Sequence, residues 1–235
     1  MYQTHKTHIK KDAKLQGLIV ENPMLLLFLE HLEIDFVVRD KTVVEICRDH
    51  KLDLNVVLLI ANIYNGFYPT KGELDHVNDI SLLIRFLKNS HDYYKNDKYP
   101  EIQKYISDLE KNHPSQDIDL ISKFFNEYFI EVLEHLDYED EIAFPYFCRI
   151  SSEKTKSETE DFSANEYRNH HTDIETKLTD LKNLLLKHIS IENDLPLRRR
   201  LLLSLFELEY DLNIHSLIEE EILLPLVEVI ENKGK

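Results

Sequence analysis

The sequence contains little glycine, little cysteine and little positive charge. Among 235 residues there are four glycines and two cysteines, and the formal net charge at pH 7 is -16. Two cysteines are too few for a disulfide scaffold and suit a reducing compartment, which predicts a cytoplasmic protein. A chain this acidic lacks the basic surface that displaces counterions from nucleic acid, so no nucleic-acid partner is expected.

Long apolar runs are also missing. No stretch approaches the roughly 20 apolar residues that a membrane-spanning helix needs, so no membrane association is expected. The first residues, MYQTHKTHIKKDAK, lack the apolar run of a signal peptide. Hydrophobic residues make up 43% of the chain and charged residues 31%, which is the composition of an ordinary globular protein that can bury a core.

Apolar residues recur at helical spacing along most of the chain, and no segment alternates as a strand would. The sequence therefore predicts an all-α protein. Gly66 and Gly72 bracket Pro69 and suggest a linker between a small N-terminal helical domain, residues 1–70, and a larger domain, residues 71–235. The first domain is expected to hold three or four short helices. Helices in the second are expected at 76–94, 100–112, 117–150, 157–190 and 196–232.

Prolines and one polar run help to place the ends of these helices. Pro100, Pro114 and Pro196 lie at expected helix starts, where the missing N–H of proline costs little. The polar run SSEKTKSETEDFS, residues 151–163, is expected to be a solvated turn between two helices.

The second domain contains an internal repeat. A shift of 80 residues superposes residues suited to metal binding, in the pairs His91 and His171, His135 and His215, Glu139 and Glu219. The same shift superposes Pro145 on Pro225. Such a repeat predicts two helical hairpins related by a pseudo-twofold axis, which together form an up-down four-helix bundle.

Two His-x-x-x-Glu motifs lie in apolar surroundings. His135 and Glu139 are four residues apart, as are His215 and Glu219, so each pair shares one helix face. Burial of an imidazole and a carboxylate without partners would cost several kcal/mol, whereas a metal ion satisfies both. The motifs therefore predict a metal site in the bundle core.

Further histidines could add ligands to this predicted site, but they are not distributed equally between the two halves of the repeat. His91 and His171 would each add one nitrogen, and the repeat favours His171 over the adjacent His170. His113 ends a predicted helix, and Asn193 occupies the shifted position. The two halves therefore differ, and one metal ion would keep an open position where a small diatomic molecule could bind.

The donor types narrow the choice of metal. Imidazole and carboxylate ligands suit iron, manganese, zinc or copper. Two carboxylates able to bridge in a bundle core favour a dinuclear pair, and iron is the usual occupant of such sites.

These residues carry a resemblance to a known family. The second domain resembles the hemerythrin-like, or HHE cation-binding, domain, whose di-iron ligands match His91, His113, His135, Glu139, His171, His215 and Glu219 one by one. The whole chain is similar to the repair-of-iron-centres family, di-iron proteins associated with iron–sulfur cluster repair after nitric oxide or oxidative stress. The resemblance implies two non-haem iron ions with an oxo or hydroxo bridge. It also implies nitric oxide or dioxygen as ligand and iron–sulfur proteins as partners, and it leaves a homodimer open.

The N-terminal domain departs from that family. The family has a Cys-Cys pair after an Ile-Asp-Phe/Tyr segment, whereas here Val37 and Val38 follow that segment and only Cys47 is kept. Chemistry that depends on the cysteine pair is therefore not expected. Three functions remain open: repair of iron centres, reversible binding or sensing of dioxygen or nitric oxide, and iron storage. The valine replacements weaken the first relative to the second.

Overall fold

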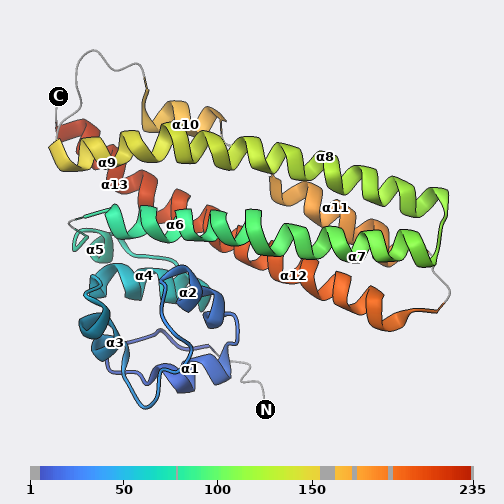
Figure 1. Cartoon of the computed structure of the whole chain (residues 1–235). Coiled ribbons are helices and arrows are strands. Elements are labelled where there is room, and N and C mark those ends of the chain that lie inside the picture. The colour runs from blue at the N-terminus through green and yellow to red at the C-terminus, as the bar shows by residue number, and fades with distance from the viewer. Residues whose placement is uncertain (1–5, 78, 154–161, 171–173, 190–192, 234–235) are drawn as a thin grey trace. The chain divides into compact units, whose positions relative to one another are not determined.

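The structure is a computed structural model that describes residues 6–77, 79–153, 162–170, 174–189 and 193–233 (Figure 1). Within these ranges every regular element is helical, apart from one isolated β-bridge between Lys14 and Thr42. The predicted all-α class is confirmed, with a helical N-terminal region followed by the long helices of a bundle. No helix among the described residues is both long and apolar enough to cross a lipid bilayer.

Short helices fill the N-terminal region, in agreement with the sequence. They are α1 (Leu15–Glu21), α2 (Leu25–His31), α3 (Val43–His50), α4 (Leu54–Tyr64) and the one-turn α5 (Lys71–Leu74). Helix α3 begins with a capping box, in which Thr42 and Glu45 satisfy each other's backbone N–H groups. Asp53 caps α4 by accepting hydrogen bonds from the N–H groups of Asn55 and Val56.

The remaining helices are longer and include three π-helical turns. The α-helices are α6 (Ser81–Tyr93), α7 (Tyr99–Asn112), α8 (Gln116–Tyr138), α9 (Phe144–Glu153), α10 (Ala164–His170), α11 (Ile174–Lys187), α12 (Leu195–Ile218) and α13 (Leu224–Lys233). The π-helices are η1 (Tyr94–Lys98), η2 (Glu139–Ala143) and η3 (Glu219–Leu223). Most of the polar run 151–163, predicted to be a turn, lies outside the described residues.

Each π-helix precedes a proline. Pro100, Pro145 and Pro225 each follow the last π residue by two positions. Proline removes the hydrogen bond to the carbonyl four residues earlier and clashes with it, and that carbonyl lies inside the π turn in each case. The wider turn lets the helix continue. Pro100 lies in the first turn of α7, as the sequence predicts, but α7 continues directly from α6 and η1 in one uninterrupted helical run.

The 80-residue repeat is visible in the bounds of the elements. Helix α8 ends at Tyr138, and α12 ends at Ile218, the residue that corresponds to it under the shift. The π-helices η2 and η3 and the helices α9 and α13 repeat with the same offset. The first helices of the two halves are not equivalent, because residues 174–178, which correspond to η1, are α-helical.

The chain folds as two compact units. The first comprises Met1–Ser90, Phe144–Ala164 and Ile214–Lys235, and the second comprises His91–Ala143 and Asn165–Asn213. The long helices α6 and α12 contribute residues to both. The domain boundary at residue 70, which comes from the sequence, stays a prediction.

In the first unit an aromatic cluster joins α6 to the N-terminal helices. The ring of Phe86 lies 5.2 Å from the ring of His31 and 6.3 Å from that of Tyr64, both edge-on. The side-chain amide of Asn89 donates a hydrogen bond of 2.8 Å to the carbonyl of His31. The middle of α6 is thus packed against the helices that precede it.

The second unit is a closed four-helix bundle (Figure 1). Side chains connect each neighbouring pair of helices in the order α7, α8, α11, α12 and back to α7. The connecting pairs are Tyr99 with Tyr128, Glu131 with Lys177, Thr179 with Glu209, and Ser204 with Glu101. This ring is the bundle that the repeat predicted.

A buried cation lies where α12 meets η1 and α7. The side chain of Lys98 is 7% exposed and forms ion pairs with Glu101 at 2.8 Å and Glu207 at 2.6 Å. Burial disfavours the charge, but the two carboxylates outweigh burial and raise the pKa of Lys98 above its usual value. Burial and Glu207, which accepts the hydroxyl hydrogen bond of Tyr93, raise the pKa of Tyr93.

We predict that Lys98→Met lowers the free energy of unfolding by about 2 to 3 kcal/mol, because Glu101 and Glu207 lose their shared cation. The matched control is Lys123→Met, since Lys123 is 72% exposed and lies 3.8 Å from Glu127; a change within about 0.5 kcal/mol is expected. Urea unfolding measures both. Because the pKa of Lys98 is raised above 10.5 in the folded state, its contribution to stability is fully present below about pH 10.5 and is lost as the pH rises through the folded-state pKa. The difference in free energy of unfolding between wild type and Lys98→Met should therefore disappear at that high pH.

Candidate metal centre

Glu139 presents its two carboxylate oxygens to two different histidines. It is the first residue of η2, follows α8 directly and has 0% exposure. Its Oε2 lies 3.2 Å from Nε2 of His91, and its Oε1 lies 3.1 Å from Nε2 of His135. A carboxylate in this position can bind one cation through each oxygen.

Tyr167 makes a further contact with this carboxylate. Its hydroxyl donates a hydrogen bond of 2.6 Å to Oε1 of Glu139, and its side chain is buried. The sequence analysis missed Tyr167. One signal was available, because Tyr167 precedes the candidate ligand His171 by four residues, the spacing that places two residues on one helix face.

Both nitrogens of His91 face carboxylates. Besides the contact of Nε2 with Glu139, Nδ1 lies 3.1 Å from Oδ1 of Asp140, whose other oxygen accepts a hydrogen bond of 3.0 Å from Lys95. A neutral imidazole carries one N–H and can donate to only one of the two carboxylates, which leaves its other nitrogen available as a metal ligand. Burial raises the pKa of Asp140, but its contacts with His91 and Lys95 outweigh burial and lower it.

In the second motif, His215 lies between the carboxylate of Glu219 and the hydroxyl group of Ser90. Nε2 of His215 lies 3.4 Å from Oε1 of Glu219, the first residue of η3, and Glu219 has 0% exposure. Nδ1 of His215 lies 2.8 Å from the hydroxyl oxygen of the buried Ser90.

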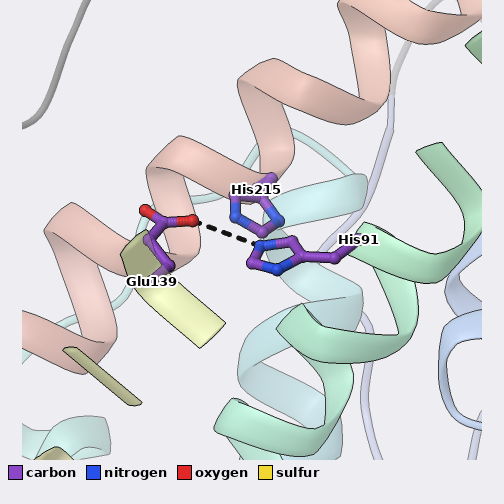
Figure 2. A group of neighbouring side chains, drawn as sticks. All are labelled: His91, Glu139 and His215. Carbon is purple, nitrogen blue, oxygen red and sulfur yellow. Dashed lines mark ion pairs between the residues drawn. The ribbon is translucent and has the colours of Figure 1, made fainter. Parts of the chain in front are cut away.

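Three of these residues form a compact group of metal-ligand type. His91, Glu139 and His215 each offer one ligand atom, and the three atoms lie within 4.8 Å of one another. Figure 2 shows the two imidazoles and the carboxylate directed toward a common point from α6, η2 and α12. For metal–ligand bonds of about 2.1 Å, adjacent ligand atoms lie roughly 3.0 to 3.4 Å apart. The contact of 3.2 Å between His91 and Glu139 has this spacing, so this pair of donors fits a transition-metal ion, and the ligand nitrogen of His215 lies within 4.8 Å of both.

Among the described residues, the structure does not bring the sequence-predicted ligand His113 to this group. His113 caps the end of α7 and lies 3.5 Å from Asp194. It follows His91 by 22 residues of one helical run, which corresponds to about 30 Å. His113 therefore cannot share a metal ion with His91 in this conformation. His171 lies outside the described residues.

The N-terminal segment that lacks the cysteine pair has no reactive thiol in its place. Val37 is 73% exposed and Val38 is 4% exposed. Cys47 is a buried free thiol, and burial raises its pKa to about 11. Cys148 is exposed at the surface, and desolvation of its thiol by neighbouring groups raises its pKa as well.

Comparison with known protein families matches residues 82–227 to the hemerythrin HHE cation-binding domain. The match extends from the beginning of α6 into α13 and covers both His-x-x-x-Glu motifs. No curated protein matches the chain.

We predict that Tyr167→Phe lowers the free energy of unfolding of the metal-free protein by about 1 to 3 kcal/mol, because a buried carboxylate oxygen loses a donor. The matched control is Tyr146→Phe, since the Tyr146 hydroxyl donates a hydrogen bond of the same length, 2.6 Å, to the less buried Glu231. The control should lose about 1 kcal/mol. Equal losses in urea unfolding would contradict the importance of burial at Glu139.

Proposed function

The chain belongs to the hemerythrin HHE cation-binding family, and on that premise we propose that its bundle holds two iron ions for reaction with a small diatomic molecule. One observation carries the proposal: the buried carboxylate of Glu139 directs one oxygen to His91 and the other to His135. Two metal positions that share one carboxylate explain this arrangement better than a single ion would.

The residues divide between the two proposed positions according to their contacts. His91, Glu139 and His215 would hold the first ion. His135 and the other oxygen of Glu139 would hold the second, with His171 added on the strength of the sequence repeat. Glu219 would be the second carboxylate ligand, from its contact with His215. When bound, the iron pair supplies redox chemistry and an open position for nitric oxide or dioxygen.

The chain's own side chains define the conditions at these positions. Glu139 and Glu219 have 0% exposure, and the three histidines that face them are buried. A buried donor set limits the access of water and influences both affinity and redox potential. Tyr167 holds the carboxylate of Glu139 in place through its hydroxyl group.

Within this reading, the first candidate role is repair of iron centres after nitric oxide or oxidative stress, with iron–sulfur proteins as partners in the cytoplasm. The second is reversible binding or sensing of nitric oxide or dioxygen. Val37 and Val38 replace the expected thiols, and burial raises the pKa of Cys47 to about 11, so both observations favour the second role over any thiol-dependent step.

Metal analysis tests the site itself. We expect about two iron ions per chain in the wild type, and their loss in the double variant His135→Ala, His215→Ala, because each position loses an imidazole. His113→Ala is the matched control and should keep its iron, since His113 contacts Asp194 instead of the group. An unchanged iron content in the double variant would refute the proposal.

Nitric oxide turnover separates the two roles. We expect the reduced, iron-loaded protein to hold nitric oxide in a stoichiometric complex, detected by its optical spectrum, with no steady release of nitrous oxide. Catalytic conversion of nitric oxide to nitrous oxide, measured by gas chromatography, would contradict the binding role and favour redox turnover. The control is Glu139→Ala, which lacks the shared carboxylate and should show neither behaviour.

A further inference from the structure

We propose that Ser90 and Asp140 are positioning residues that fix which nitrogen of His215 and His91 carries the proton. In both rings the proton is placed on Nδ1, and the lone pair of Nε2 is directed toward the carboxylates of the candidate metal centre. The inference rests on the proposed function for its purpose, but its geometric basis lies in contacts of this chain alone.

The assignment at Ser90 follows from counting protons. The hydroxyl group of Ser90 has one hydrogen, which it donates to the carbonyl oxygen of Leu87, one helical turn earlier, at 2.7 Å. The carbonyl can only accept, so the second contact of the hydroxyl oxygen, 2.8 Å to Nδ1 of His215, requires the ring to donate. Neutral His215 therefore carries its proton on Nδ1, which leaves Nε2 as the ligand atom.

The ligand nitrogen of His215, Nε2, faces the carboxylate of Glu219. Nε2 lies 3.4 Å from Oε1 of Glu219, so the serine orients the imidazole from the side opposite to the carboxylate. Ser90 is 1% exposed, and water does not replace its hydroxyl group easily. The residue next to it in the chain, His91, belongs to the candidate centre itself. Helix α6 thus supplies one ligand and the support for another.

Asp140 orients His91 as Ser90 orients His215, but it does so through a charged carboxylate instead of a neutral hydroxyl group. Its Oδ1 lies 3.1 Å from Nδ1 of His91, and a carboxylate accepts hydrogen bonds but donates none. Lys95 holds Asp140 in place, at 3.0 Å from Oδ2, and also contacts Asp137 at 2.9 Å. Nε2 of His91 is then directed to Glu139, at 3.2 Å.

The two supports differ in charge, which makes the two imidazoles unequal ligands. A negatively charged acceptor on Nδ1–H increases the electron donation of the other nitrogen, while a neutral hydroxyl does so less. His91 is therefore the stronger donor of the two. Loss of the supporting charge at Asp140 should weaken metal binding more than loss of the hydroxyl group at Ser90.

The proton positions are measurable without any metal. Protein labelled with ¹⁵N-histidine, metal-free and at about pH 9, gives long-range ¹H–¹⁵N spectra that report the tautomer of each neutral ring. We expect Nδ1–H for His91 and His215 in the wild type. Ser90→Ala should convert His215 toward Nε2–H, and the control Ser204→Ala should not, since Ser204 is a buried serine, 7% exposed, that contacts Glu101 instead. Nε2–H at His215 in the wild type would overturn the inference.

Cobalt(II) binding, followed by its visible absorption, supplies the second readout. We expect affinity to fall about 10-fold in Ser90→Ala and further in Asp140→Ala, within the range typical for loss of a supporting hydrogen bond. Asp140→Asn keeps an acceptor for Nδ1–H but not the charge, so it should keep the tautomer and still lose affinity. The control Asp137→Ala, which contacts Lys95 but not His91, should bind cobalt within twofold of the wild type.

The outcomes distinguish this inference from the proposed function. Wild-type protein that binds no cobalt would count against the metal centre, and the tautomer spectra would then decide the role of Ser90 and Asp140 alone. If cobalt binds but Ser90→Ala and Asp140→Ala match the wild type in affinity and tautomer, the positioning role is refuted while the metal site stands. Thermal unfolding of each variant, compared with its control, identifies any loss of affinity that comes from misfolding.

Discussion

The structure depends on the burial of carboxylates among imidazoles in the core of a helical bundle. Glu139 and Glu219 have no exposed surface, and an ionised carboxylate in such a place costs several kcal/mol unless a cation or strong donors compensate. At Glu139 the compensation comes from His91, His135 and Tyr167. The three groups arrive from three different helices, so the carboxylate connects the bundle and at the same time presents a site for metal ions.

The backbone around these acids is shaped by π-helical turns that accommodate prolines. Both carboxylates are the first residue of a π turn, and each turn is followed by a proline that an ordinary α-helix would not tolerate without a break. A π turn adds one residue to the turn and changes the direction in which later side chains point. The motif His-x-x-x-Glu followed by proline therefore combines ligand spacing with a local change of helical register. The chain uses this combination twice.

The two halves of the repeat share their backbone but differ in the groups around the metal candidates. His91 is supported by a carboxylate that Lys95 holds, whereas His215 is supported by the neutral hydroxyl group of Ser90. Only the first half has a π turn near its leading histidine, among the residues that the structure describes. The repeat therefore contains two similar His–Glu pairs whose surroundings are unequal.

Local periodicity and the internal repeat determined much of this protein from sequence alone. Helical spacing predicted the all-α class, because this spacing depends only on residues close in sequence. The offset of 80 residues predicted the repeated elements and the pairs His135–Glu139 and His215–Glu219, because the same residue pattern occurs in both halves. Which atoms meet across helices was decided by the tertiary structure alone. The contacts of Tyr167 with Glu139 and of Ser90 with His215 join residues 28 and 125 positions apart, and no periodicity encodes them. The position of His113 beside Asp194 was also decided by the tertiary structure. The helix continues without a break through Pro100, so His113 lies about 30 Å from His91.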